Sequence, residues 1–178
     1  GIAMLDLNDT PESMEPLFET ILKYIPAPEG DPDAGTQVLI STIDYNEYVG
    51  RIGVGKVDNG KIAVNQEVLL MNHHDPDKKK KVKISKLYEF EGLDKVEVKE
   101  ATIGSIVAIS GIADIHIGDT LCDPEHPEPI PFQKISEPTI AMHFIVNDSP
   151  LAGQEGKFVT SRHLRDRLYR ELNTDVSR

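Results

Sequence analysis

The chain has 178 residues, of which 39% are hydrophobic and 28% charged, and its formal net charge is −11. This length suits one domain or two small ones, and the composition excludes the disordered class. No apolar run approaches the roughly 20 residues of a membrane-spanning helix, and the acidic balance argues against a surface that wraps nucleic acid. The single cysteine, Cys122, excludes an internal disulfide and fits a reducing compartment, so we expect a cytoplasmic protein.

Residues 1–35 are predicted to form one amphipathic helix followed by a linker. Thr10 is expected to be the N-cap and Pro11 the first helical residue, and apolar residues recur every three or four positions from Met14 to Ile25. The Pro- and Gly-rich run of residues 26–35 then marks a domain boundary.

Residues 36–124 carry short β-branched runs separated by turn signals, a pattern typical of a closed β-barrel of six to eight strands. Asn59-Gly60 predicts a hairpin between the runs on its two sides, since both residue types tolerate positive φ. The stretch "HHDPDKKKK", residues 73–81, is predicted to be a polar loop, with its lysines in solvent. A structural zinc site there would need a second cluster of ligands elsewhere in the chain, and the sequence shows none.

The stretch "GRIGVGKV", residues 50–57, matches a phosphate-binding loop except that Val57 replaces Ser or Thr. A working loop of this kind opens a helix, whose N-terminus holds the phosphates. Here Asn59-Gly60 follows within four residues, and valine cannot bind Mg²⁺. We therefore interpret the stretch as a glycine-rich strand, and we find no catalytic or metal-binding motif elsewhere in the chain.

Residues 125–178 are predicted to contain a proline-rich connector, a strand over "PTIAMHFIVN" (residues 138–147) and a helix capped by Thr160 or Ser161. One strand and one helix cannot enclose a core, so this part resembles an incomplete α+β unit. The helix region is basic, and it carries the candidate RNA-binding residues Lys157, Arg162, Arg165, Arg167 and Arg170. A solvated helix face explains the same composition equally well.

Three stretches together resemble the TypA/BipA family of ribosome-binding translational GTPases. They are "DYNEYVGRIGVGKVDNGKIAVNQEV", "YEFEGLDKVEVKEATIGSIVAISGIADIHIGDTL" and "EPTIAMHFIVNDSPLAGQEGKFVTSRHLRDRL". The first two are similar to the second-domain barrel of elongation factors Tu and G, and the third to the opening of the family's third domain. The sister factor LepA shares the plan but fits the third stretch less well. One local departure is Ser105, where the family usually has Asp.

The resemblance implies three parts: the last helix of a GTP-binding domain with its linker (1–35), the barrel (36–124), and a connector with the first strand and helix of a ferredoxin-like domain (125–178). It implies that GTP and Mg²⁺ bind in a domain upstream of Gly1, so no catalytic, cofactor or metal residue is expected in this chain. The ribosome, both rRNA and protein, is the implied partner of a monomeric factor with no membrane contact. The exposed barrel residues Arg51 and Lys56 are secondary RNA candidates. The rival readings are a LepA-like fragment, a small nucleotide hydrolase and a protein-interaction barrel without RNA contact.

Overall fold

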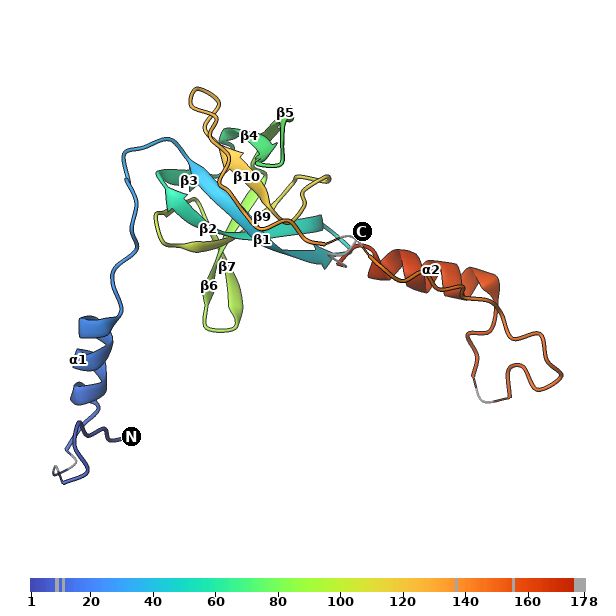
Figure 1. Ribbon diagram of the computed structural model, residues 1–178, viewed down its shortest axis with the longest axis horizontal. Helices are drawn as coiled ribbons and strands as arrows, with labels where there is room; N and C mark the ends of the chain where they lie inside the picture. Colours follow the sequence, from blue (N-terminus) through green and yellow to red (C-terminus); the bar gives the residue numbers. More distant parts are fainter. Residues whose placement is uncertain (9, 11, 137, 155, 175–178) are drawn as a thin grey trace. The chain divides into compact units, whose positions relative to one another are not determined.

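The computed structural model describes residues 1–178 except residues 9, 11, 137, 155 and 175–178 (Figure 1). The chain divides into two compact units, Gly1–Gly30 and Asp31–Arg178. None of the described helices is long and apolar enough to cross a membrane.

The first unit contains one helix, α1 (Glu15–Tyr24), which begins later than predicted. Met14 is the N-cap and makes no capping hydrogen bond through its side chain, whereas Thr10 lies outside the helix and Pro11 outside the described residues. Pro16 explains the later start. It lies in the first turn here, but in a helix from residue 11 its ring would meet a carbonyl of the preceding turn. All apolar residues of α1 are at least partly exposed.

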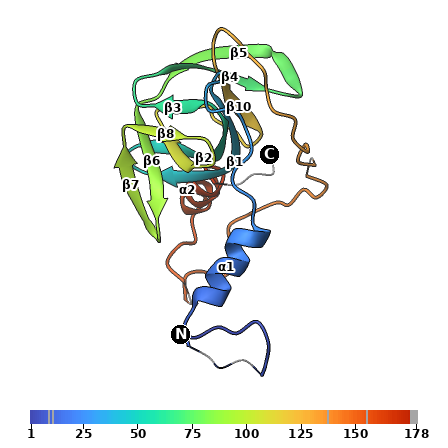
Figure 2. The same cartoon turned by 90° about the vertical axis from the view of Figure 1, so that its left-hand side faces the viewer.

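The second unit is built on an eight-stranded antiparallel sheet with the order β5-β4-β10-β1-β2-β9-β6-β7. A separate two-stranded sheet pairs β3 with β8 (Figure 2). The strands are β1 (Gln37–Asn46), β2 (Gly50–Asn59), β3 (Lys61–Ala63), β4 (Glu67–Asn72), β5 (Asp75–Lys83), β6 (Lys86–Glu91), β7 (Asp94–Val98), β8 (Glu100–Thr102), β9 (Ile106–Ser110) and β10 (Asp119–Cys122).

Both sheets contribute to the main hydrophobic core. Ile62 from β3 and Ala101 from β8 pack in the same cluster as the inward residues of the large sheet, which include Val38, Val57 and Ile109. Strand β4 is buried on both faces, because Leu69 and Met71 form a second cluster with Cys122 on the side away from this core. A strand covered on both sides is expected to be apolar throughout, as "VLLM" is.

The prediction of a closed barrel is not supported. The large sheet has eight strands, within the predicted six to eight, but β3 and β8 bring the described strands to ten. In the part of the chain that the structure describes, the end strands β5 and β7 do not pair with each other. Among the described strands β7 pairs with β6 alone, and the two form a hairpin that projects from the sheet (Figure 1). Strand β5 presents lysines along its length, and charged residues keep an edge strand from pairing, so closure is not needed to protect it.

The hairpin predicted at Asn59-Gly60 is also wrong, although the turn is present. Gly60 has φ +64°, but β3 leaves the large sheet and pairs with β8 instead of β2. The side chain of Asn59 accepts a hydrogen bond from the Asp31 N–H (2.9 Å) and donates one to Gln37 Oε1 (2.6 Å). The Asn-Gly pair therefore directs the chain from one sheet to the other.

The predicted loop "HHDPDKKKK" is largely strand β5. It forms a hairpin with β4, in which Leu69 lies opposite Lys81 and Leu70 opposite Lys80. The polar composition suggested a loop, but an edge strand needs only one hydrogen-bonded neighbour and tolerates proline and lysine. Its lysines are in solvent, as expected, but on a fixed strand.

The strand predicted for residues 138–147 does not form. This segment has no ladder partner among the described residues, and an isolated extended segment cannot satisfy its backbone groups within a sheet. The helix after it, α2 (Ser161–Glu171), does form, and the Thr160 hydroxyl accepts the capping hydrogen bond from the His163 N–H. Phe144, Ile145 and Val146 lie along α2 and line a shallow groove with Leu168.

Candidate functional site

The stretch that resembles a phosphate loop is strand β2 along its entire length. Val57 is fully buried in the core, its N–H donates to the Ser105 carbonyl (2.9 Å), and Lys56 forms an ion pair with Asp58 (3.6 Å). A Cβ on Gly55 would overlap the carbonyl oxygen of Leu39, which explains the glycine by close strand packing. Directly after Lys56 the chain continues as strand β2 and not as a helix, so these residues offer no phosphate cradle.

The basic residues of α2 are exposed and engaged in ion pairs. Arg162 and Arg165 both approach Asp166, at 3.8 and 3.7 Å. Arg167 pairs with Glu171, one turn further along the helix. Such exposed pairs are worth about 0–1 kcal/mol each, so a phosphate can displace the carboxylate. The guanidinium groups of Arg162, Arg165 and Arg167 are exposed, but a contact with another anion would first break one of these pairs.

The remaining predicted RNA-binding residues lie in two different settings. Arg170 reaches Glu47 (3.5 Å), and Arg51 on β2 donates hydrogen bonds to the carbonyls of Ile115 (3.4 Å) and Leu172 (3.5 Å). The structure thus brings Arg170 and Arg51 to the same end of the β1–β2 hairpin. Lys157 lies in the exposed segment before α2, and no ion pair joins it to the described residues.

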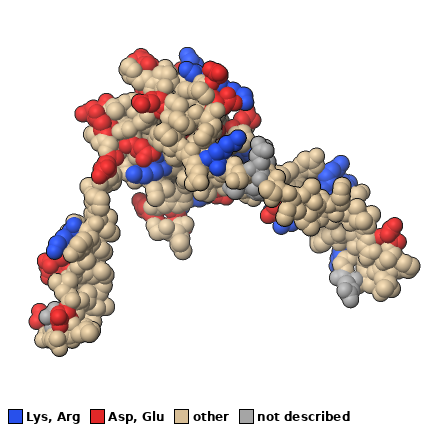
Figure 3. All heavy atoms as spheres, in the orientation of Figure 1, with Lys and Arg blue, Asp and Glu red and all other residues tan. Residues whose placement is uncertain are grey.

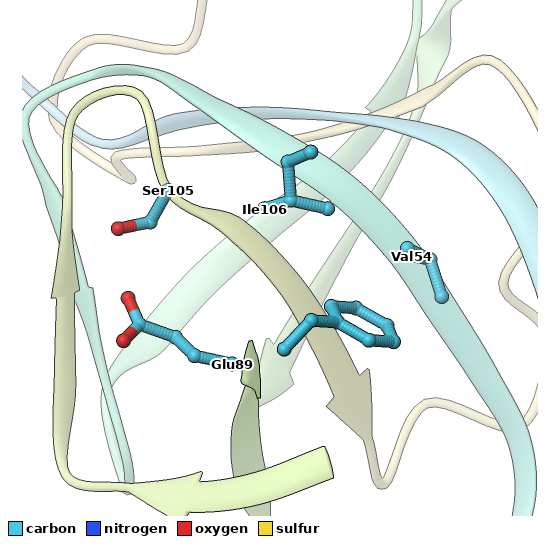
Figure 4. Close-up of a pocket in the computed structure, with 5 residues that line it drawn as sticks. Val54, Glu89, Ser105 and Ile106 are labelled. Carbon is cyan, nitrogen blue, oxygen red and sulfur yellow. The ribbon is translucent and has the colours of Figure 1, made fainter. Parts of the chain in front are cut away.

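A shallow hollow of about 530 Å³ lies on the outer face of β2, β6 and β9. Val54 and Ile106 lie on one side of it, and the Glu89 carboxylate and the Ser105 hydroxyl lie on the other (Figure 4). Phe90 completes the lining and is 39% exposed, and Ile106 is 58% exposed. The hollow offers an apolar floor beside two hydrogen-bonding groups, but no nucleophile paired with a base. Sequence reasoning noted only Ser105 of these residues.

The proline-rich connector is fastened to the sheet. The Glu128 carbonyl accepts from Gln37 Nε2 (2.8 Å) and from Cys122 Sγ (3.3 Å), and the Ile130 N–H donates to the Thr120 hydroxyl (3.1 Å). This cover buries Cys122, and burial raises the pKa of its thiol to about 11. Cys122 is therefore a protected core residue and not a reactive thiol.

The end of the connector reaches the β4–β5 turn. His74 Nε2 lies 3.0 Å from the Phe132 carbonyl oxygen, and the two rings meet edge to face at 4.8 Å between centroids. These contacts give His74 a packing role. The described residues contain no cluster of His, Cys, Asp and Glu that could hold a metal ion.

Two surface carboxylates, those of Asp44 and Asp114, have lowered pKa values. A hydrogen bond from Lys95 lowers the pKa of Asp44, and one from Lys80 lowers the pKa of Asp114. Both groups are at the surface and pair with lysine, as ordinary structural ion pairs do.

Comparison with known proteins fits this architecture. Residues 50–122 match the family model described as elongation factor Tu domain 2. The chain is 50% identical over 177 residues to the large ribosomal subunit assembly factor BipA of Synechocystis sp., 45% identical to that of Bacillus subtilis and 44% identical to that of Escherichia coli K12. Each alignment covers 99% of this chain but only 29% of the relative, so the chain spans less than a third of their length.

The mainly β fold and the matched family model define a translation-factor module of the elongation factor Tu domain 2 class. The identity to the three assembly factors extends across the α1 segment, the sheet, the connector and α2. The chain belongs to the TypA/BipA family.

Proposed function

We propose that residues 1–178 form a ribosome-binding segment of a TypA/BipA-type GTPase. The observation that carries the proposal is the 43–50% identity, over 99% of this chain, to proteins named large ribosomal subunit assembly factors. In this proposal the two β-sheets and α2 bind the factor to the large ribosomal subunit. The candidates for contact with rRNA are Lys157, Arg162, Arg165, Arg167 and Arg170, with Arg51 and Lys56 as secondary candidates.

The proposal assigns GTP hydrolysis, with its Mg²⁺, to sequence other than residues 1–178. Strand β2 supports this assignment, because the only phosphate-loop pattern in the sequence is part of a sheet and continues into no helix. The chain alone is expected to bind neither GTP nor GDP. A titration with a fluorescent GTP analogue in the presence of Mg²⁺ tests this directly, and saturable micromolar binding would contradict it.

Ribosome association is tested by pelleting the chain with purified large ribosomal subunits. The expected result is a fraction in the pellet that falls steeply as salt rises, since phosphate contacts release counterions. A chain with Arg162, Arg165, Arg167 and Arg170 changed to alanine should pellet less than the wild type. Equal pelleting would remove α2 from the interface, and an absence of wild-type binding would refute the proposal.

Two alternatives remain distinguishable. The relatives reported above all carry the BipA name, which favours this type of factor over a LepA-like one. A protein-interaction module is supported by the apolar hollow with Phe90 and Ile106. That reading predicts pelleting that is insensitive to salt and lost in an Ile106→Asp variant. We also expect the chain to be monomeric, which analytical ultracentrifugation can check.

A further inference from the structure

The most basic of the described strands is β5, and three of its five lysines form no ion pair with the described residues. Lys78 pairs with Asp75 (2.5 Å) and Lys80 with Asp114 (2.6 Å). By contrast, no described carboxylate lies within ion-pair distance of Lys79 or Lys81. Figure 3 shows the blue lysine atoms gathered along this edge, with acidic atoms between them.

Strand geometry arranges these lysines in two sets. Alternate residues share one face of a strand at a spacing of about 6.8 Å, so Lys81 and Lys83 lie on one face of β5 and Lys80 lies on the other. The register with β4 shifts between Asp75 and Lys80, and in this irregular part Lys78 and Lys79 both line a groove with Lys80. Lys83 lies opposite Glu67 in the β4–β5 register, which offsets part of its charge. Among the described residues, Lys79 and Lys81 are therefore the lysines of β5 with neither an ion pair nor a carboxylate opposite them in the register.

The connector brings a further lysine to the same edge. Lys134 and Lys79 both line a groove of about 810 Å³ beside β5, although they are far apart in the sequence. The contact between His74 and the Phe132 carbonyl fixes the connector there. No ion pair joins Lys134 to the described residues.

The acidic residues of this groove are mostly occupied. Asp75 and Asp114 hold the paired lysines, and Asp119 accepts hydrogen bonds from Asn72 (2.9 Å) and from the His116 backbone (2.8 Å). Asp77 is the remaining carboxylate of the lining. Within the described part of the chain, the lysines without an ion pair here are thus Lys79 and Lys134 in the groove and Lys81 beside it. We call these three residues the β5 lysine set.

We propose that the β5 lysine set is a contact surface for the phosphate backbone of RNA. The proposal rests on the proposed function, which supplies an RNA-rich partner. A cation without a partner can neutralise a phosphate at no cost in broken ion pairs, whereas the α2 arginines must each leave a carboxylate. Compact ammonium groups on a rigid strand bind phosphates by position and charge, without reading the base sequence.

The competing explanation is that the lysines only protect an open sheet edge from pairing with another chain. This explanation requires charge on β5, but it assigns no role to Lys134, which lies outside the strand. The two explanations predict different consequences when the charges are removed.

The test compares the wild-type chain with the variant Lys79→Gln, Lys81→Gln, Lys134→Gln. The probe is a labelled RNA duplex of about 16 base pairs, the length spanned by a typical double-stranded RNA-binding domain. The affinity is measured by fluorescence anisotropy over a series of salt concentrations. Each lost phosphate contact should make the slope of log K against log salt shallower by about 0.9, and three contacts by about 2.7.

Two matched variants accompany it. Lys61→Gln, Lys86→Gln, Lys95→Gln changes net charge by the same amount but removes lysines paired with Glu100, Glu97 and Asp44, and its slope should stay within one unit of the wild-type slope. Lys79→Arg, Lys81→Arg, Lys134→Arg keeps the charge and should retain the binding. Circular dichroism confirms that each variant is folded.

Several results would overturn the proposal. One is an equal loss of slope in both glutamine variants, which would reflect net charge alone. Another is an unchanged slope in the β5 variant together with self-association in ultracentrifugation, which would assign the lysines to edge protection. A third is competition by polyglutamate as strong as by RNA, which would indicate an acidic protein partner. If the β5 variant pellets with large subunits as well as the wild type does, this inference fails while the proposed function stands.

Discussion

Replacing Val57 with threonine completes the phosphate-loop pattern in "GRIGVGKV" while changing the shape of the side chain very little. If the pattern governed function, this single change would create a nucleotide site. The structure predicts that it only weakens the fold. Val57 is fully buried in the core, and Lys56 and Val57 pair with Leu39 and Val38 of β1.

The magnitude follows from the environment of the side chain. Threonine is nearly isosteric with valine, so the cavity penalty is small and the buried hydroxyl dominates, at about 1–3 kcal/mol. A loss near 2 kcal/mol lowers the urea midpoint by about 1 M, given the slopes usual for small domains. Alanine at this position removes two methyl groups and leaves a void, for a loss of about 1.5–3 kcal/mol.

Urea unfolding followed by circular dichroism measures the stability, and titration with a fluorescent GTP analogue and Mg²⁺ measures nucleotide binding. The expected outcome for Val57→Thr is a lower midpoint and no binding. Micromolar GTP affinity in the variant, or a midpoint equal to that of the wild type, would refute the assignment of residues 50–57 to a core strand.

Three further predictions concern the connector, α2 and an ion pair. The Cys122 thiol, with a pKa of about 11 against a reference value of 9.0, should label about 100-fold more slowly than a free thiol at pH 8, and Thr120→Val should speed labelling by loosening the connector. Thr160→Ala should destabilise α2 by about 1 kcal/mol, whereas Thr160→Ser should not. Amide hydrogen exchange in α2 measures the difference, and equal exchange rates in the two variants would exclude the cap. Lys95 lowers the pKa of Asp44, so this pair's stabilisation is present above the carboxyl's unfolded pKa and is lost as pH falls through its folded pKa. Asp44→Asn should cost at most about 1 kcal/mol at pH 7 and nothing at pH 2, and an equal cost at both would contradict the pairing.

Local signals predicted the features that depend on local structure. The glycines and Val57 of β2 indicate a strand from residue type alone, and Thr160 is one of two residues that the sequence predicts to cap α2. In both cases the deciding interactions lie within a few residues or follow from residue size. The late start of α1 could also have been found, since Pro16 limits how far the helix extends toward the N-terminus.

The features that sequence reasoning missed depend on partners distant in the chain. Asn59-Gly60 looks like a hairpin turn, but the partner of β3 is β8. The lysine-rich run has the composition of a loop because the apolar residues of its hairpin, such as Leu69 and Met71, are on the partner strand β4. Residues 138–147 have a strand composition but no partner strand within the described residues, and composition alone cannot supply one.

The sequence predicts which residues of α2 are candidates for RNA contact, but it does not predict what surrounds them. Composition identified the α2 arginines, yet their pairing with Asp166 and Glu171 is a feature of side-chain geometry. The fastening of the connector, which brings Lys134 to β5, has no signal in the sequence, because it depends on backbone carbonyls such as that of Phe132. A basic surface assembled from separate segments becomes visible only in three dimensions.

The central claim is that this segment of a TypA/BipA-family chain binds the ribosome. The most direct test is to pellet the purified 178-residue chain with large ribosomal subunits, with small subunits and with neither, at low and at high salt. The account predicts saturable pelleting with large subunits that is lost at high salt. No pelleting with large subunits at low salt, or equal pelleting with both subunits and no salt dependence, would contradict it.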